Sequence, residues 1–100
     1  MPQSLLHGLQ LNALVALDAL LGERSVTRAA RRIGVTQPAM SQTLARLRVL
    51  FDDPLLVQSG RVMKLTPRAD AMLVPLGEAL QAVERAVQLG LRFEPKTSRR

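Results

Sequence analysis

The side chains with the most distinctive chemistry gather in one short segment of the sequence, Thr36 to Phe51. Amide and hydroxyl groups stand near its start and guanidinium groups further along, in the order Gln37, Ser41, Gln42, Arg46 and Arg48. Amides and hydroxyls bind the edges of bases, whereas guanidinium groups bind phosphates and guanine. These residue types therefore predict recognition of DNA, with base edges contacted first and phosphates second.

The same segment has the pattern of an amphipathic helix. Thr36 can cap it through its hydroxyl, and Pro38 falls in the first turn, where a missing N–H costs little. Spacings of four, three and four residues place the apolar side chains on one narrow arc, formed by Met40, Leu44, Leu47 and Phe51. The opposite side and its edges collect Gln37, Pro38, Ser41, Gln42, Ala45, Arg46 and Arg48. We expect a recognition helix that begins at Gln37.

Two shorter apolar patterns precede this helix. The first spans Leu9 to Leu21, and Gly22 is expected to end it. The second follows Ser25 as a cap, repeats at i, i+3, i+4 and i+7 through Val26, Ala29, Ala30 and Ile33, and is expected to end at Gly34. A second helix joined so tightly to the polar helix predicts a helix-turn-helix. An ordinary pair of antiparallel helices in a small bundle is the alternative.

A turn signal, Asp52-Asp53-Pro54, stops the recognition helix. Two β-compatible runs, 55 to 58 and 61 to 65, then flank Ser59-Gly60 and predict a hairpin, which would serve as a wing. Arg61 and Lys64 would lie near its tip or on its second strand, within reach of the minor groove or the backbone. Each taken alone is equally consistent with a solvated surface cation.

A long helix is expected after the wing. Thr66 offers a cap and Pro67 the first helical position, and the helix is expected to end near Gly90, with Pro75 bending or loosening one turn. Its apolar stripe consists of Met72, Leu76, Leu80, Val83 and Val87. One small domain has little interior for so long a stripe, so we assign it to a dimer interface. Packing back on residues 11 to 21 is the alternative.

Composition limits the class of protein. One hundred residues make one small domain, which should be marginally stable alone, so a partner is expected. Hydrophobic residues reach 47%, yet there are two Phe, no Trp and no Tyr, which favours packed helices over a sheet. Residues 24 to 68 hold nine cations and two anions, and therefore carry more than the whole net charge of +6. A basic middle suits nucleic acid, although a solvated basic surface is the simpler alternative.

Other function classes have little support in the sequence. There is no cysteine, so disulfides and Cys-based zinc sites are excluded, and we expect no metal and no cofactor. The only histidine, His7, lies in an unpatterned segment, residues 1 to 8, and the only adjacent carboxylates form the Asp52-Asp53 turn. We therefore expect no enzyme activity. No apolar stretch reaches the length of a membrane span.

The residues resemble the N-terminal domain of the LysR-type transcriptional regulators. The resemblance covers about Leu9 to Leu91 and is carried by Ser25, Ala29-Ala30, Gly34, Thr36 to Ser41, Leu44, Leu47, Asp53 to Leu56 and Leu65 to Pro67. Arg46-Leu47-Arg48 followed by Phe51-Asp52-Asp53-Pro54 is most similar to the branch that contains the nodulation-gene activators.

The resemblance implies a mostly α fold, a winged helix-turn-helix followed by a linker helix that pairs antiparallel with its mate in a homodimer. It also implies a cytoplasmic, nucleoid-associated bacterial transcription factor that recognises DNA through Thr36, Gln37, Pro38, Ser41 and Gln42. We divide the chain into a DNA-binding domain (1–66), a linker helix (67–92) and a polar tail or truncated linker (93–100). Such regulators continue into an effector-binding domain, so we expect a fragment that meets a small-molecule effector only through that absent domain.

Three positions depart from the family pattern. Gln58 stands where a wing arginine is common, Ala69 replaces a common glycine, and Arg48 replaces a common glutamate. The first departure puts a strong contact from that wing position in doubt. The leading hypothesis is sequence-specific binding of a roughly palindromic double-stranded DNA site by a dimer. The alternative is a helical protein-interaction module with only non-specific affinity for DNA.

Overall fold

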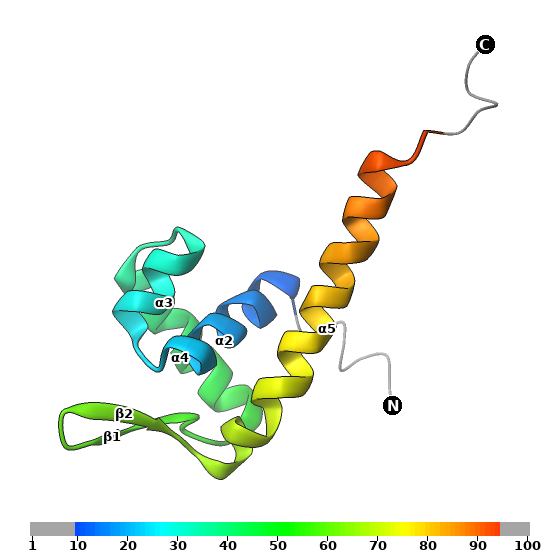
Figure 1. Cartoon of the computed structure of the whole chain (residues 1–100). Coiled ribbons are helices and arrows are strands. Elements are labelled where there is room, and N and C mark those ends of the chain that lie inside the picture. Colours follow the sequence, from blue (N-terminus) through cyan, green and yellow to red (C-terminus); the bar gives the residue numbers. More distant parts are fainter. Residues whose placement is uncertain (1–9, 95–100) are drawn as a thin grey trace.

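The computed structural model describes residues 10 to 94, so the segment that holds His7 and most of the predicted polar tail lie outside it. The described elements follow in the order α2 (Leu11–Glu23), α3 (Val26–Ile33), α4 (Gln37–Phe51), β1 (Leu56–Ser59), β2 (Val62–Leu65) and α5 (Pro67–Arg92). Three short helices pack together, the hairpin projects to one side, and the second half of α5 extends away from the other elements (Figure 1). This arrangement confirms the predicted mostly α fold, a winged helix-turn-helix with a long C-terminal helix.

Side-chain caps set the start of three helices, as the sequence predicts. The Ser25 hydroxyl accepts from the backbone N–H of Arg28 at 3.1 Å. The Thr36 hydroxyl accepts from Ala39 at 3.2 Å, and the Thr66 hydroxyl accepts from Ala69 at 3.1 Å. Each cap satisfies an N–H group that has no partner within its helix. The starts of α3, α4 and α5 are therefore fixed locally.

The core lies where α2, α3 and α4 meet. Its buried residues are Ala16, Leu17, Ala19, Leu20, Leu21, Ala29, Ala30, Met40, Leu44, Leu47, Leu55, Leu56 and Ala69. Ala29 and Ala30 are the buried residues of α3, and their small side chains let the neighbouring helices come close. Phe51, the last member of the predicted apolar arc, is only half-buried.

The first helix does not end at Gly22, and this prediction is wrong. Helix α2 continues to Glu23, and Arg24 takes the left-handed conformation (φ 54°) while its N–H donates to the Leu20 carbonyl at 2.8 Å. A Cβ atom on Gly22 would lie 2.9 Å from Nη1 of Arg32. Gly22 therefore provides room for the Arg32 side chain, and the chain turn falls two residues later.

The hairpin loop is also shifted by one residue from its predicted position. Ser59 pairs with Val62, so the two loop residues are Gly60 and Arg61, not Ser59 and Gly60. Gly60 has a φ of 63°, a conformation that suits glycine at the first position of a two-residue hairpin loop. This register places Arg61 in the loop itself.

Helix α5 has two halves with different surroundings. Met72 and Leu76 are half-buried and pack against the core of their own domain. Residues 81 to 92 are all exposed, including Val83 and Val87, and the helix ends at Arg92, two residues beyond the predicted end near Gly90. The first half of the stripe therefore packs against its own domain, which was the alternative to a dimer interface. No other part of the described chain covers the second half.

Candidate nucleic-acid interface

Helix α4 presents its polar side to solvent because its apolar side is fixed in the core. Met40, Leu44 and Leu47 expose only 1%, 4% and 2% of their surface. The predicted base-reading residues occupy the other side, and all are exposed: Thr36, Gln37, Pro38, Ser41 and Gln42. The structure therefore brings this predicted set together on one surface.

The N-terminal end of α4 is suited to an anion. It follows a tight link in which Gly34 (φ 78°) donates its N–H to the Ala30 carbonyl at 2.9 Å. The first turn contains no acidic residue. The Thr36 hydroxyl oxygen accepts a hydrogen bond from the Ala39 N–H, so the hydroxyl hydrogen can still be donated to a ligand. The partial positive charge of a helix N-terminus attracts phosphates. Base edges and a phosphate could therefore be bound by the same end of the helix.

The two arginines of α4 have different surroundings. Arg46 is exposed and donates from Nη2 to the Thr43 hydroxyl at 3.4 Å, so it lies along the helix surface. Arg48 is half-buried and donates to two backbone carbonyls, from Nε to Pro54 at 2.7 Å and from Nη2 to Leu56 at 2.9 Å. The sequence grouped them as equivalent phosphate contacts. The structure separates them, because the Arg48 guanidinium is held against the segment that leads into the wing.

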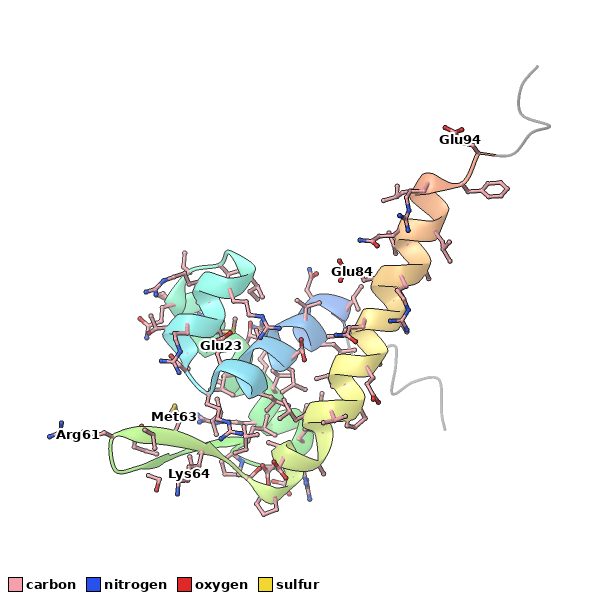
Figure 2. All side chains as sticks on the ribbon, in the orientation of Figure 1. Glu23, Arg61, Met63, Lys64, Glu84 and Glu94 are labelled. Atoms are coloured by element: carbon pink, nitrogen blue, oxygen red, sulfur yellow. The ribbon has the colours of Figure 1, made fainter. Side chains whose placement is uncertain are left out.

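The wing carries its two cations in the exposed positions expected. Figure 2 shows Arg61 at the free end of the hairpin. Met63 packs against the core, and since successive residues of a strand point to opposite faces, Lys64 points away from it. Gln58, at the position where the family commonly has arginine, donates its amide to the Gly60 carbonyl at 2.9 Å. Gln58 therefore stabilises the loop that presents Arg61.

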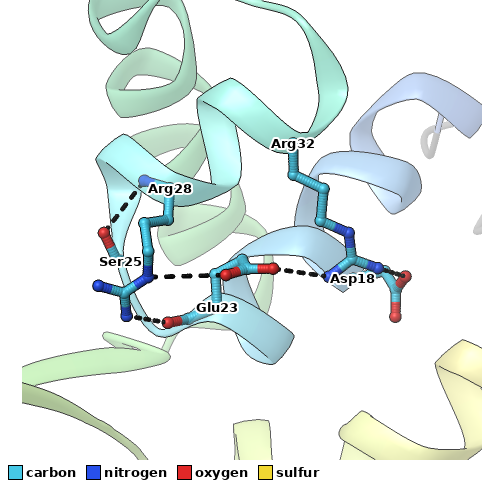
Figure 3. A network of polar contacts seen from close by, with 5 residues as sticks. All are labelled: Asp18, Glu23, Ser25, Arg28 and Arg32. Carbon is cyan, nitrogen blue, oxygen red and sulfur yellow. Dashed lines mark hydrogen bonds and ion pairs between the residues drawn. The ribbon is translucent and has the colours of Figure 1, made fainter.

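Part of the basic charge counted in the sequence is paired within the domain. Arg32 contacts Asp18 at 3.3 Å and Glu23 at 3.5 Å, joining α3 to α2 (Figure 3). Arg28 contacts the same Glu23 carboxylate at 3.6 Å and donates to the Glu23 carbonyl at 2.8 Å. These pairs are partly exposed, so each contributes little stability. The sequence analysis did not predict these ion pairs, because both acidic residues precede the basic segment, residues 24 to 68.

The junction between α4 and the wing holds a polar cluster that the sequence indicated only as a turn. One oxygen of Asp53 accepts from the Leu55 N–H at 2.8 Å and from the Thr66 hydroxyl at 2.6 Å. Arg68 donates to the Phe51 carbonyl nearby. The Thr66 hydrogen bond lowers the pKa of the Asp53 carboxyl most, and the Leu55 N–H and the Arg68 charge act in the same direction, against partial burial. Asp53 thus connects the turn to the start of α5.

Residues 11–70 match a family of proteins described as bacterial regulatory helix-turn-helix protein, lysR family. The chain belongs to this family. The family resemblance that the sequence indicated is therefore confirmed, and the exposed side of α4 is the polar face of a LysR-type helix-turn-helix.

Several curated relatives are nodulation proteins, in agreement with the branch that the sequence resembles. The chain is 48% identical over 94 residues to Nodulation protein D 2 of Bradyrhizobium elkanii, a match that covers 94% of this chain and 28% of that protein. It is 52% identical over 81 residues to Nodulation protein D 1 of Neorhizobium galegae, covering 81% of this chain and 26% of that protein. The chain thus spans less than a third of the length of these relatives.

Solved structures share both the winged domain and the long helix. A probable transcriptional regulator from Pseudomonas aeruginosa matches with a TM-score of 0.79 and 35% identity, over 91% of this chain and 30% of that chain. The DNA-binding domain of BenM, solved in complex with benA site 1 DNA, matches with a TM-score of 0.73 and 26% identity, over 84% of this chain and 94% of that chain.

Within residues 10 to 94, none of the helices is both long and apolar enough to cross a membrane.

The lowered pKa of Asp53 predicts that this carboxyl group makes the stability of the domain sensitive to acid. Its folded pKa lies below the unfolded value of about 3.9, so its contribution to stability is complete above that value and is lost as pH falls through the folded pKa. Asp53→Asn should therefore lower stability at neutral pH and flatten the loss of stability that the wild type shows as pH falls below the unfolded pKa of aspartate. Urea unfolding at a series of pH values measures both effects.

The exposed neighbour Asp52 supplies the matched control for this measurement. Asp52 adopts a left-handed conformation (φ 51°), which asparagine tolerates well. Asp52→Asn should leave the acid dependence close to that of the wild type. Parallel stability curves for Asp53→Asn and the wild type would contradict the role given to the Asp53 carboxylate.

Proposed function

We propose that the chain binds double-stranded DNA sequence-specifically as a homodimer, as the DNA-binding part of a bacterial transcription regulator. The observation that carries this proposal is the exposed polar face of α4, which lies opposite the buried side chains of Met40, Leu44 and Leu47. The similarity to the BenM domain solved with DNA supports it. The regulator would act in the bacterial cytoplasm, on the nucleoid, and binding rather than catalysis would be its role.

The side chains divide into base-reading and phosphate-binding groups in this proposal. Gln37, Ser41 and Gln42 project from the first two turns of α4 and have donors and acceptors suited to base edges in the major groove. The DNA backbone beside the same groove lies closest to Thr36, Pro38 and the backbone N–H groups of the first turn of α4. Arg46 binds phosphate along the helix, and Arg61 and Lys64 bind the DNA backbone or minor groove from the wing. Arg48 receives a different role below.

The second half of α5 supplies the dimer contact in this proposal. Leu80 is half-buried, whereas Val83 and Val87 continue the same stripe and expose 43% and 55% of their surface. A second copy running antiparallel would cover these side chains and leave Met72 and Leu76 in their own core. Two-fold symmetry then requires a roughly palindromic site, with half-sites about 34 Å apart or a multiple of that distance.

The relatives suggest what the longer protein does. Because several are nodulation proteins of about three to four times this length, the chain is proposed to be joined to a domain that binds a small-molecule effector.

Selection of bound sequences from random duplex DNA at two salt concentrations tests the proposed sequence-specific DNA binding. A consensus that persists at high salt supports base readout, whereas uniform, salt-sensitive binding favours an interaction module with non-specific DNA affinity.

Substitutions in the base-reading and phosphate-binding groups of α4 should affect DNA affinity in different ways. Gln42→Ala should weaken binding to the selected site by about 1–3 kcal/mol and leave affinity for random DNA nearly unchanged, because it removes a base contact. Arg46→Ala should weaken binding to both DNAs and reduce the slope of log K against log salt by about one. Titrations of both DNAs at several salt concentrations serve as the measurement. Equal losses on selected and random DNA for Gln42→Ala would remove its base-reading role.

The dimer contact is tested by two valines on opposite sides of α5. Val83→Asp should place an unpaired carboxylate in the apolar contact and weaken self-association at least tenfold without unfolding the domain. Val74 lies nine residues earlier, half a turn around the helix, and is also exposed, so Val74→Asp should leave association unchanged. Sedimentation velocity and DNA titration measure the result. A dimeric Val83→Asp variant, or a wild type that is monomeric while it binds tightly, would contradict the assignment.

A further inference from the structure

One arginine connects the recognition helix directly to the wing. Arg48, in the last turn of α4, donates from Nε to the Pro54 carbonyl at 2.7 Å and from Nη2 to the Leu56 carbonyl at 2.9 Å. Leu56 is the first residue of β1. Hydrogen bonds from a charged donor are stronger than neutral ones, and two of them from one planar group also fix direction. Arg48 therefore holds the point at which the wing begins.

The residue between these two carbonyls has an unfavourable backbone conformation. Leu55 has a φ of 65°, in the left-handed region that a leucine rarely adopts, and its side chain is completely buried. Such a conformation persists only where surrounding contacts determine it. Asp53 binds the Leu55 N–H, the Thr66 N–H donates to the Leu55 carbonyl at 3.0 Å, and Arg48 binds the carbonyls on either side.

This arrangement leaves Arg48 poorly placed for direct phosphate binding. Two of its donor groups are already satisfied by the backbone, and its side chain is half-buried. To reach outward, the guanidinium would have to release the start of the wing. Arg46, two residues earlier, is exposed and makes no such contact with the wing among the described residues.

We propose that Arg48 is a positioning residue for DNA recognition, which fixes the wing so that Arg61 reaches DNA while α4 occupies its groove. The inference rests on the proposed function. Arg61 lies five residues beyond Leu56, so at about 3.3 Å per residue the wing tip is roughly 16 Å from this clamp. A rotation of about 10° at the clamp would move the tip by about 3 Å, as far as a hydrogen bond is long. Small changes at Arg48 are therefore amplified at Arg61.

A double-mutant cycle with Arg61 tests this role. Arg48→Met keeps the aliphatic stem and removes the donors, and if it does not fold, Arg48→Gln takes its place. Arg48→Met and Arg61→Ala should each weaken binding to the selected site by about three- to tenfold. The double variant should bind within about twofold of the weaker single variant, because both lose the same wing contact. Arg46→Ala combined with Arg61→Ala is the matched control, and its two losses should multiply.

The salt dependence separates positioning from direct contact. In the Arg61→Ala background, Arg48→Met should leave the slope of log K against log salt unchanged. A further fall of about one unit, or losses that multiply in the cycle, would overturn the proposal and return Arg48 to the phosphate contacts.

Hydrogen exchange without DNA keeps the inference independent of the proposed function. Arg48→Met should accelerate amide exchange in residues 56 to 65 while leaving residues 11 to 33 close to wild type. Unchanged exchange in the hairpin would overturn the clamp itself. If the wild type selects no DNA sequence, the proposed function fails, and the exchange experiment alone then decides whether Arg48 holds the wing.

Discussion

Burial of three large side chains on one side of α4 determines how the rest of the domain is arranged. Met40, Leu44 and Leu47 are almost completely enclosed, and burial of such side chains contributes about 1.5–3 kcal/mol each. Only one rotation of the helix encloses all three, so the opposite side must face solvent. The exposed set around Ser41 and Gln42 is therefore a consequence of packing. These polar side chains do not have to hold the helix in place and remain available for a ligand.

The wing depends on a second constraint, which is a backbone conformation instead of an apolar contact. The chain leaves α4 through Asp53 and Leu55 and must turn sharply enough to place Leu55 in the core and start β1 at the next residue. The left-handed φ of Leu55 makes that turn, and side chains from α4, the turn and the start of α5 hold it. The recognition helix, the wing and the long helix are thus joined at one small polar cluster. Because Thr66 caps α5 and donates to Asp53, the cap and the turn support each other.

Most features set by neighbouring residues can be predicted from the sequence, although the hairpin loop lies one residue later than predicted, whereas features set by distant contacts cannot. The caps at Ser25, Thr36 and Thr66 and the apolar arc of α4 depend on residues three or four positions apart. The three caps are confirmed, and the arc is confirmed except at its last member, which is only half-buried. The end of α2 was misplaced because Gly22 makes room for a side chain of another helix. Within the candidate site, the exposed α4 face and Arg61 at the wing tip can be predicted. Arg48 is predicted to bind phosphate because its carbonyl partners lie in and just after a turn whose geometry the sequence does not give.

The kind of acceptor that an arginine finds decides how much of its charge remains available to DNA. Arg28 and Arg32 contact carboxylates, so their charge is largely compensated within the α2–α3 pair. Arg48 and Arg68 donate to carbonyls of the α4–wing junction, which satisfies their donors without cancelling a full charge. Arg48 therefore keeps its charge but uses two of its donor groups to hold the start of the wing, so direct phosphate contact in the proposed complex falls to the exposed Arg46 and Arg61.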